Sequence, residues 1–416
     1  MGAHHIQFEL TTNRMQSTFS TFSLIALVIF ASYPAKIGYG DDELPTITIG
    51  HLDLIEDVRY EDWGIHPVDI RSATAIVDHR AYAGAQLAVE ELKQFKRIAK
   101  AHFSLKRVSV TDPFDMIAEI LKMRESGVQF FLIDAPEHIL SEVAKQTHDQ
   151  GIYLFNTTAI GDALRNEDCQ QHLFHFAASR AMLTDAIVQY LVSQKWNRVL
   201  VLRGPLPEDF KMTQAFERSA EHFGLNIIKT RNFLLGNDPR ARETNDLDFL
   251  TGKARYDAVF VADADGEFAL GIPFATQDPA TVTGASGIVP RVWHWSYLRH
   301  GAPQVHGRFE RMHGRRMGQP DWGAWVALKT LGMAIARSKT TDPVKVVDYL
   351  RSGELRIDGS KGPGLSIRPW NNQLRQPILL TTENWTITRA PIEGFRHRTN
   401  DLDTIGFGER DTTCNF

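Results

Sequence analysis

The sequence predicts an α/β protein of two lobes, each a mostly parallel sheet with helices on both faces. Apolar runs of four to six residues alternate with helical segments of about a dozen residues, which is typical of buried parallel strands. This alternation stops near residue 170 and then begins again, so two sheets are expected in series. The chain of 416 residues is long enough for two domains with separate cores.

The first lobe begins with the β-branched run TITIGHLDLI at 46 to 55, which predicts a strand. Apolar residues then recur at helical spacing between residues 80 and 96, with charged residues to one side, so an amphipathic helix is expected there. The remaining expected elements are strands at 107 to 112, 128 to 134 and 152 to 156, and helices at 114 to 126 and 137 to 149.

The second lobe repeats this pattern. Its expected strands are 172 to 177, 197 to 205, 225 to 233 and 256 to 263, and its expected helices are 180 to 195, 208 to 223 and 243 to 252. Beyond residue 265 the alternation loosens. The later segments predict a strand at 291 to 298, an apolar helix at 323 to 338, a shorter helix at 343 to 351, and β segments between 365 and 390 that turn at Asn371 and Asn372.

The amino terminus has the pattern of an export signal. A ten-residue apolar run at 22 to 31 follows Arg14 and precedes several small residues. A membrane-spanning helix needs about twenty apolar residues, so residues 1 to 40 are predicted to be a cleaved signal peptide, with an uncleaved anchor as the alternative. The mature protein is then expected in the periplasm, without membrane insertion.

These patterns give a division of the chain. Lobe 1 is predicted at 41–176 and completed by about 291–345, and lobe 2 is predicted at 177–290 and completed by about 346–395. Residues 396–416 form a C-terminal tail.

The net charge and the cysteine content narrow the classes of protein to which this chain could belong. The formal net charge is -4, and removal of residues 1 to 40, which carry Glu9, Arg14 and Lys36 (net +1), makes it -5. No basic excess therefore points to nucleic acid or to an anionic membrane. The two cysteines, Cys169 and Cys414, suit either one bridge in an oxidising compartment or two unpaired thiols.

The opening ITIG strand, the double α/β unit, the apolar helix near 330 and the closing β segments together resemble the periplasmic solute-binding proteins of the Leu/Ile/Val-binding class. The segments VRYEDWGIHP, VLVLRGPLPED, VADADGEF and RVWHWSYL, with the Cys-terminated tail, resemble a subfamily of these binders associated with pyrroloquinoline-quinone (PQQ) dependent alcohol dehydrogenase systems. The resemblance implies the two-lobed type I periplasmic-binding-protein fold, a small-molecule ligand and ABC transporter permease partners, and it implies no enzymatic activity and no cofactor.

The resemblance also directs attention to particular strand ends. In the amino-acid-binding members, Ser or Ala and Thr at two strand ends of the first lobe hold the ligand's carboxylate and amino groups. The first of those ends reads Asp134, Ala135, Pro136, without a hydroxyl, and the second retains Thr157 and Thr158. Arg203 replaces the expected aromatic residue of the second lobe, and an acidic partner for an amino group is expected at Asp263 or Asp265. Of the two strand ends that hold an amino acid in those members, only the second keeps a hydroxyl in this sequence, so half of the expected amino-acid site is missing.

Chemistry at the strand ends predicts a planar, carboxylated ligand. Ligands of open α/β sheets bind outside the carboxyl ends of the strands. Guanidinium groups bind carboxylates through two parallel hydrogen bonds and stack on aromatic faces, and PQQ has that character. The predicted ligand-binding residues are Trp63, Ala135, Thr157, Thr158, Arg180, Arg203, Asp263 and Trp295, with further cations at Arg59 and Arg291. The alternative is that the tryptophans belong to the core and the arginines to the solvated surface.

The chain has none of the common nucleophile, phosphate-loop, zinc-protease or dinucleotide motifs, and no metal site is predicted. We therefore expect a periplasmic receptor of an ABC-type import system, linked to PQQ-dependent alcohol oxidation, that closes two lobes on PQQ or a related carboxylate. One alternative is a receptor for a branched-chain or other amino acid. The other is an accessory protein that docks on a periplasmic dehydrogenase and transports nothing.

Overall fold

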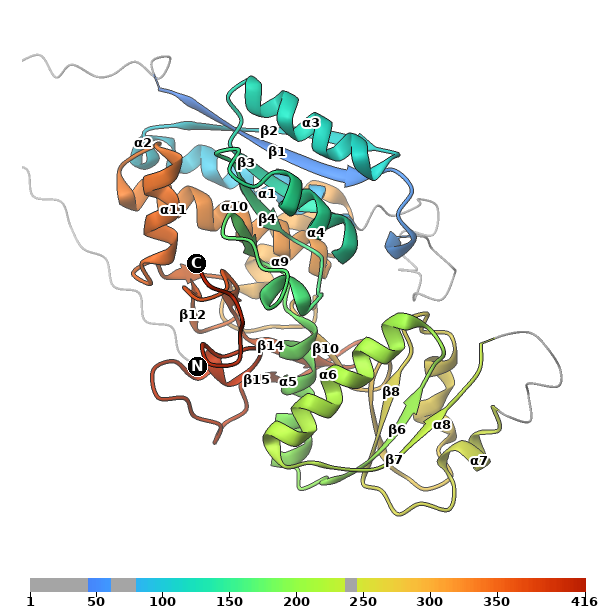
Figure 1. The fold of residues 1–416 in the computed structure, drawn as a ribbon. Helices are drawn as coiled ribbons and strands as arrows, with labels where there is room; N and C mark the ends of the chain where they lie inside the picture. The colour runs from blue at the N-terminus through green and yellow to red at the C-terminus, as the bar shows by residue number, and fades with distance from the viewer. Residues whose placement is uncertain (1–43, 61–79, 236–244) are drawn as a thin grey trace, which may run out of the picture. The chain divides into compact units, whose positions relative to one another are not determined.

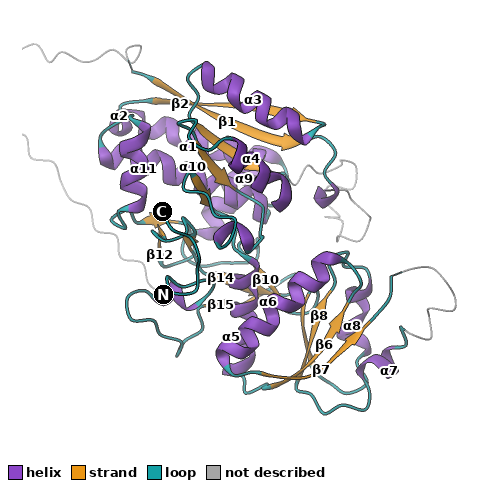
Figure 2. Cartoon of the chain, in the orientation of Figure 1, coloured by secondary structure: helices purple, strands orange, loops and turns teal. Residues whose placement is uncertain are grey.

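The computed structural model describes residues 44–60, 80–235 and 245–416. These residues contain two parallel sheets that are covered by helices (Figure 1; Figure 2). The predicted signal peptide and Trp63 lie outside the described residues.

The sheet of lobe 1 has five parallel strands in the order β2-β1-β3-β4-β5. They are β1 (Thr46–Leu54), β2 (His102–Val110), β3 (Phe130–Asp134), β4 (Tyr153–Asn156) and β5 (Leu173–His175). Every residue of β3 is buried, as expected for a central strand with helices on both faces. The register places Asp53 beside Asp134, so two carboxylates lie at one edge of this sheet.

Helices cover both faces of this sheet. On one face lie α3 (Pro113–Glu125) and α4 (Glu137–Gln146), whose buried apolar residues form a core with those of β1, β3 and β4. The other face packs against α1 (Tyr82–Leu92) and α10 (Gln319–Ser338). These two helices approach closely at Gly84, where an added Cβ would lie 1.8 Å from the Asp321 carbonyl oxygen.

The sheet of lobe 2 has four parallel strands in the order β7-β6-β8-β9. They are β6 (Arg198–Arg203), β7 (Asn226–Asn232), β8 (Ala258–Ala262) and β9 (Thr281–Gly284). One face packs on α5 (Arg180–Ser193) and α6 (Pro207–Phe223), and the other on α7 (Leu247–Thr251) and α8 (Ile272–Ala275). The prediction of parallel sheets with helices on both faces is therefore confirmed for both lobes.

The last third of the described chain connects and completes these layers. Antiparallel strands β10 (Val289–Arg291), β14 (Ile378–Thr381) and β15 (Thr386–Ala390) form one small sheet, and β11 (Ile357–Asp358), β12 (Gly364–Ile367) and β13 (Leu374–Arg375) form another. Two further helices are α9 (Ala302–His313) and α11 (Pro343–Arg351). None of the helices within the described ranges is long and apolar enough to span a membrane.

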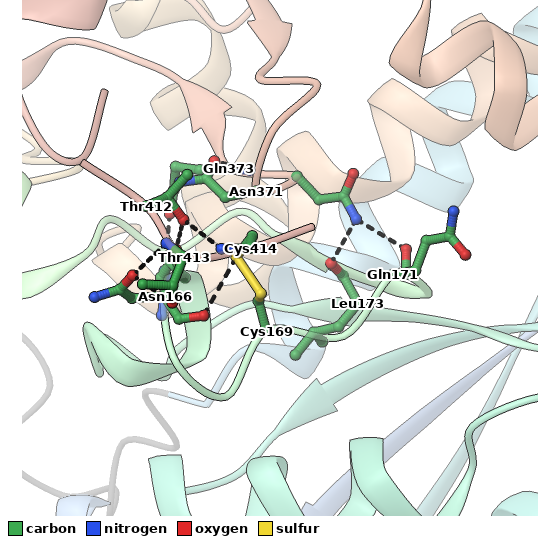
Figure 3. The surroundings of a disulfide bond; sticks show 11 residues. Asn166, Cys169, Gln171, Leu173, Asn371, Gln373, Thr412, Thr413 and Cys414 are labelled. Atoms are coloured by element: carbon green, nitrogen blue, oxygen red, sulfur yellow. Dashed lines mark hydrogen bonds between the residues drawn. A yellow bond between two sulfur atoms is a disulfide. The ribbon is translucent and has the colours of Figure 1, made fainter. Parts of the chain in front are cut away.

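The C-terminal tail is held by a disulfide between Cys169 and Cys414, whose Cα atoms lie 5.8 Å apart (Figure 3). Next to the bridge, the Thr413 backbone N–H donates to the Asn166 side-chain oxygen at 2.7 Å. Earlier in the tail, the Gly406 backbone N–H donates to the Asp185 carboxylate on α5 at 2.6 Å. The tail therefore contacts both a loop that follows β4 of lobe 1 and a helix of lobe 2.

Candidate functional site

The carboxyl ends of the strands carry the polar side chains that the sequence singles out. In lobe 1, β3 ends at Asp134 and β4 at Asn156, and in lobe 2, β6 ends at Arg203 and β8 is followed by Asp263. Because loops leave a parallel sheet at this edge and free its backbone groups, this is where a doubly wound α/β fold binds ligands.

In lobe 1 the strand-end groups already pair with one another. The buried Asp134 carboxylate accepts hydrogen bonds from Arg59 at 3.0 Å, from the Tyr60 hydroxyl at 2.8 Å and from the Thr158 hydroxyl at 2.8 Å. Arg59 is also paired with Asp57 at 2.6 Å and donates to the Thr158 hydroxyl at 2.9 Å. Burial, and then the Asp134 charge, raise the pKa of Tyr60 well above its ordinary value, so Tyr60 remains a neutral donor.

The other residues predicted for this edge differ in environment. Thr157 is buried, and its hydroxyl donates to the Ile133 carbonyl at 3.0 Å. Ala135 is buried in the core beneath α3 and α4. Thr158 is half-buried. Of the three, Thr158 alone lies in the Asp134 network.

Arg203 and Phe210 together form a surface in lobe 2 that is both cationic and aromatic. Its guanidinium lies 4.3 Å from the centre of the Phe210 ring, and its Nε donates to the Asn232 side chain at 3.2 Å. Phe210, in the first turn of α6, is 43% exposed. Sequence reasoning missed Phe210, although an apolar residue in the acidic first turn of a helix that follows a strand end is a signal that could have identified it.

At the same edge, one carboxylate oxygen of Asp263 has no hydrogen-bond partner among the described residues. The carboxylate is buried, and Oδ2 accepts a hydrogen bond from the Ala269 backbone N–H at 2.8 Å. Oδ1 is buried without a hydrogen-bond partner among the described residues. Burial raises the pKa of Asp263 above its ordinary value, and the nearby charges of Asp209 and Asp265 add to this effect.

Arg180 lies in an ion cluster that links the two lobes. At the first turn of α5, its guanidinium contacts Glu208 of α6 at 2.5 Å and Glu137 of α4 at 3.3 Å. Lys211 of α6 pairs with the same two glutamates. Burial acts to raise the pKa of Glu137, but Lys211 and Arg180 bring it below its ordinary value. Glu137 is therefore a carboxylate that two cations of lobe 2 hold.

Trp295 lies in the segment that leaves lobe 2 after β10. Its half-buried indole is covered by the Arg316 guanidinium, 3.8 Å from the ring centre. Trp293, two residues earlier, is buried and stacks on Trp322 with ring centres 6.3 Å apart. Trp293 thus belongs to the core, whereas Trp295 and Arg316 form a flat surface.

Two hollows in the described part of the chain have volumes of about 320 and 270 Å³. The first lies beside Pro45, Ile98 and Lys339, and the second beside α4 and Asp168. Neither is lined by Asp134, Arg203 or Asp263. We place the candidate site at the strand ends because Arg203, stacked on Phe210, and Asp263, whose Oδ1 has no partner among the described residues, both lie there in lobe 2. No group of three or more metal-binding side chains occurs in the part of the chain that the structure describes.

This architecture is the two-lobed periplasmic-binding-protein fold. No protein-family model matches the sequence, and no curated protein matches it significantly. Among solved structures, an ABC transporter substrate-binding protein from Sphaerobacter thermophilus is similar over 87% of this chain and 100% of its own length, with 15% identity and a TM-score of 0.67.

Two other similar structures were solved with amino acids. An ABC transporter substrate-binding protein from Desulfitobacterium hafniense, in complex with Leu, is 16% identical with a TM-score of 0.64, over 82% of this chain and 99% of its own. A branched-chain amino acid transporter substrate-binding protein from Streptococcus pneumoniae, in complex with isoleucine, is 14% identical with a TM-score of 0.59, over 83% of this chain and 98% of its own. At these identities the likeness establishes the fold.

Proposed function

We propose that this protein is the periplasmic solute-binding component of an ABC-type importer and that it binds a small carboxylated ligand between its lobes. The observation that carries the proposal is the gathering of strand-end cations and aromatic faces, above all Arg203 on Phe210, in a fold whose similar structures include ligand-bound importer components. Contacts from both lobes to one ligand exist only when the lobes close, so the ligand stabilises the closed form that a permease recognises.

The ligand that we favour is PQQ or a related planar carboxylate of the alcohol-oxidation system. Two flat cationic surfaces, at Arg203 with Phe210 and at Arg316 with Trp295, support it, because a guanidinium beside an aromatic face suits a planar acid. In lobe 1, by contrast, the Thr158 hydroxyl is engaged by Asp134 and Arg59.

An amino acid is the second candidate, and Asp263 favours it. Its Oδ1 is a buried carboxylate oxygen without a protein donor, and an ammonium group would satisfy it. The leucine and isoleucine complexes of the similar structures are consistent with this candidate.

The test is calorimetric titration of the purified mature protein with PQQ, leucine and isoleucine, with tryptophan fluorescence recorded in parallel. We expect saturable binding of PQQ that is lost in Arg203→Ala. Binding of an amino acid alone would assign the protein to amino-acid import, and binding of no solute would reject the receptor function in favour of docking on a dehydrogenase.

A further inference from the structure

Most of the arginines near the strand ends have their charge balanced within the protein. Arg59 lies between two aspartates, and Arg180 lies between two glutamates. A carboxylate ligand gains less from a guanidinium that another carboxylate already holds, because the attraction to the ligand must replace an existing pair. A ligand carboxylate gains more from a cation that no carboxylate of the described residues holds, such as Arg203, whose Nε donates to the Asn232 side chain.

Arg291 is such a cation. It is half-buried at the end of β10, and within the described ranges its guanidinium has neither a hydrogen bond nor an ion pair with the protein. Its Nε is buried without a partner. The side chain as a whole is half-buried, so part of it is open to solvent.

The electrostatic environment of Arg291 is also unusual. Burial lowers its pKa below the ordinary value, and no carboxylate contributes in the opposite direction. A cation that is removed from water without an acid partner is costly. The side chain stays charged, because a guanidinium retains its proton far above neutral pH, and an incoming anion would relieve this cost.

The neighbours of Arg291 add positive charge and a flat surface. Burial lowers the pKa of His294 to about 4, and the charges of Arg291 and Arg316 act in the same direction. His294 is thus neutral at pH 7, and its Nδ1 is hydrogen-bonded to the Ser296 hydroxyl at 2.7 Å. Next to it, the Trp295 indole lies beneath Arg316.

One more hydroxyl on the same connection lacks a partner. Ser286, in the turn between β9 and β10, is buried, and its Oγ has no hydrogen-bond partner among the described residues. Between residues 286 and 295, the buried polar atoms without partners are the Ser286 hydroxyl, the Arg291 Nε and the Trp293 indole nitrogen, each of which can donate a hydrogen bond. Donors without acceptors favour a ligand that is rich in acceptor oxygens.

We propose that Arg291 and Trp295 form a carboxylate-binding subsite on the connection that follows lobe 2, which takes the acid group of a planar aromatic carboxylate while its ring lies against the indole. The planar guanidinium matches a carboxylate through two parallel hydrogen bonds. The subsite rests on the proposed receptor function and names the class of its ligand. It adds an anionic contact after β10 to the one that we propose at Arg203.

The experiment compares acids with their amides on the wild-type protein and three variants. Calorimetry and tryptophan fluorescence would follow binding of PQQ, isophthalate and benzoate, with benzamide as the uncharged counterpart and inorganic phosphate as a non-planar anion. The variants are Arg291→Gln, Arg291→Lys and the control Arg198→Gln. The control removes an exposed arginine that pairs with Asp257 and lies at the start of β6, at the end of the strand away from Arg203.

We expect the wild-type protein to bind the aromatic acids at least tenfold more tightly than benzamide or phosphate. The affinity of Arg291→Gln for these acids should be at least tenfold lower than that of the wild type. The affinity of Arg291→Lys should lie between those two values, and the affinity of Arg198→Gln should equal that of the wild type. If Arg291→Gln fails to fold, Arg291→Lys still decides the matter, because lysine keeps the charge but cannot form two parallel hydrogen bonds to a carboxylate.

Equal affinity of wild type and Arg291→Gln for the acids would overturn the subsite, and so would equal binding of benzoate and benzamide. Binding of leucine or isoleucine without binding of any aromatic acid would overturn the subsite and leave the receptor function standing. Binding of no solute at all would reject both.

Discussion

The Arg59 guanidinium lies 3.0 Å from the Asp134 carboxylate, at the carboxyl end of β3. The Asp134 carboxylate also accepts hydrogen bonds from the Tyr60 and Thr158 hydroxyls. The polar groups at this strand end of lobe 1 are thereby bound to one another in an internal network.

Asp134→Asn should therefore destabilise the fold. Asp134 is fully buried, and the substitution removes one of the two carboxylates that hold Arg59 and leaves a buried hydrogen-bond donor of the network without its acceptor, at a cost of about 1 to 3 kcal/mol. Urea unfolding would measure it. The control is Asp257→Asn, which removes a pair with the exposed Arg198 and should cost less than about 1 kcal/mol. Equal stability of Asp134→Asn and wild type would contradict the structural role of the network.

The disulfide should contribute strongly to stability. Cys169 and Cys414 are separated by 245 residues, and closing so long a loop stabilises by up to about 5 kcal/mol in the chain-entropy model. Cys169→Ser/Cys414→Ser should lower the melting temperature, and dithiothreitol should lower that of the wild type but not that of the double variant. Because Arg368 also binds the tail through Asp403 at 2.9 Å, the variant should remain folded. A melting temperature equal to that of the oxidised wild type would contradict this prediction.

Buried histidines should make the protein sensitive to acid. Burial lowers the pKa of His172 to about 4, with the His148 charge acting in the same direction, and burial likewise lowers that of His294 to about 4. A histidine whose folded-state pKa is depressed binds fewer protons when folded, so its stabilising contribution is complete above the unfolded pKa of about 6.5 and is lost as the pH falls towards 4.

Each of these two histidines should lower the free energy of unfolding at pH 5 by about 2 kcal/mol relative to pH 7. Urea unfolding at the two pH values would measure the loss. His172→Gln keeps a polar partner for the Thr147 hydroxyl, which lies 3.2 Å from His172 Nε2, and should show a smaller loss than the wild type. An identical pH dependence in the variant would argue against a buried neutral His172.

The alternation of short strands and helices could be predicted because each layer is encoded locally. The run at 46 to 55 corresponds to β1 (Thr46–Leu54), and the run at 128 to 134 contains β3 (Phe130–Asp134). The strand predicted at 291 to 298 was wrong in its bounds, since β10 is Val289–Arg291. There, side chains rather than a neighbouring strand satisfy the Val292 backbone: Gln319 accepts its N–H at 2.9 Å, and Lys361 donates to its carbonyl at 2.8 Å.

The partners of the strand-end charges could not be predicted in this way. The sequence predicts Arg180 as a ligand-binding residue, and it does not predict the pairs of Arg180 with Glu137, 43 residues earlier, and with Glu208, 28 residues later. Such pairs depend on how separate layers meet, which neither periodicity nor composition reports. The same limit applies to Arg291, whose lack of a partner becomes visible only when every surrounding segment is in place.

The ion cluster of Glu137 should affect ligand release more than folding. Glu137 belongs to α4 of lobe 1, whereas Arg180 and Lys211 belong to α5 and α6 of lobe 2. If the lobes close on a ligand as we propose, these pairs favour the closed form, and Glu137→Gln should weaken ligand binding about threefold to tenfold, mainly through faster dissociation.

Because lysine and glutamate in this cluster are partly exposed, the effect should shrink as the salt concentration rises. Stopped-flow tryptophan fluorescence at low and high ionic strength would measure both rates. The matched control is Glu119→Gln, which removes a surface pair with Lys122 within the single helix α3. A Glu137→Gln dissociation rate equal to that of the control would show that the cluster does not hold the lobes together.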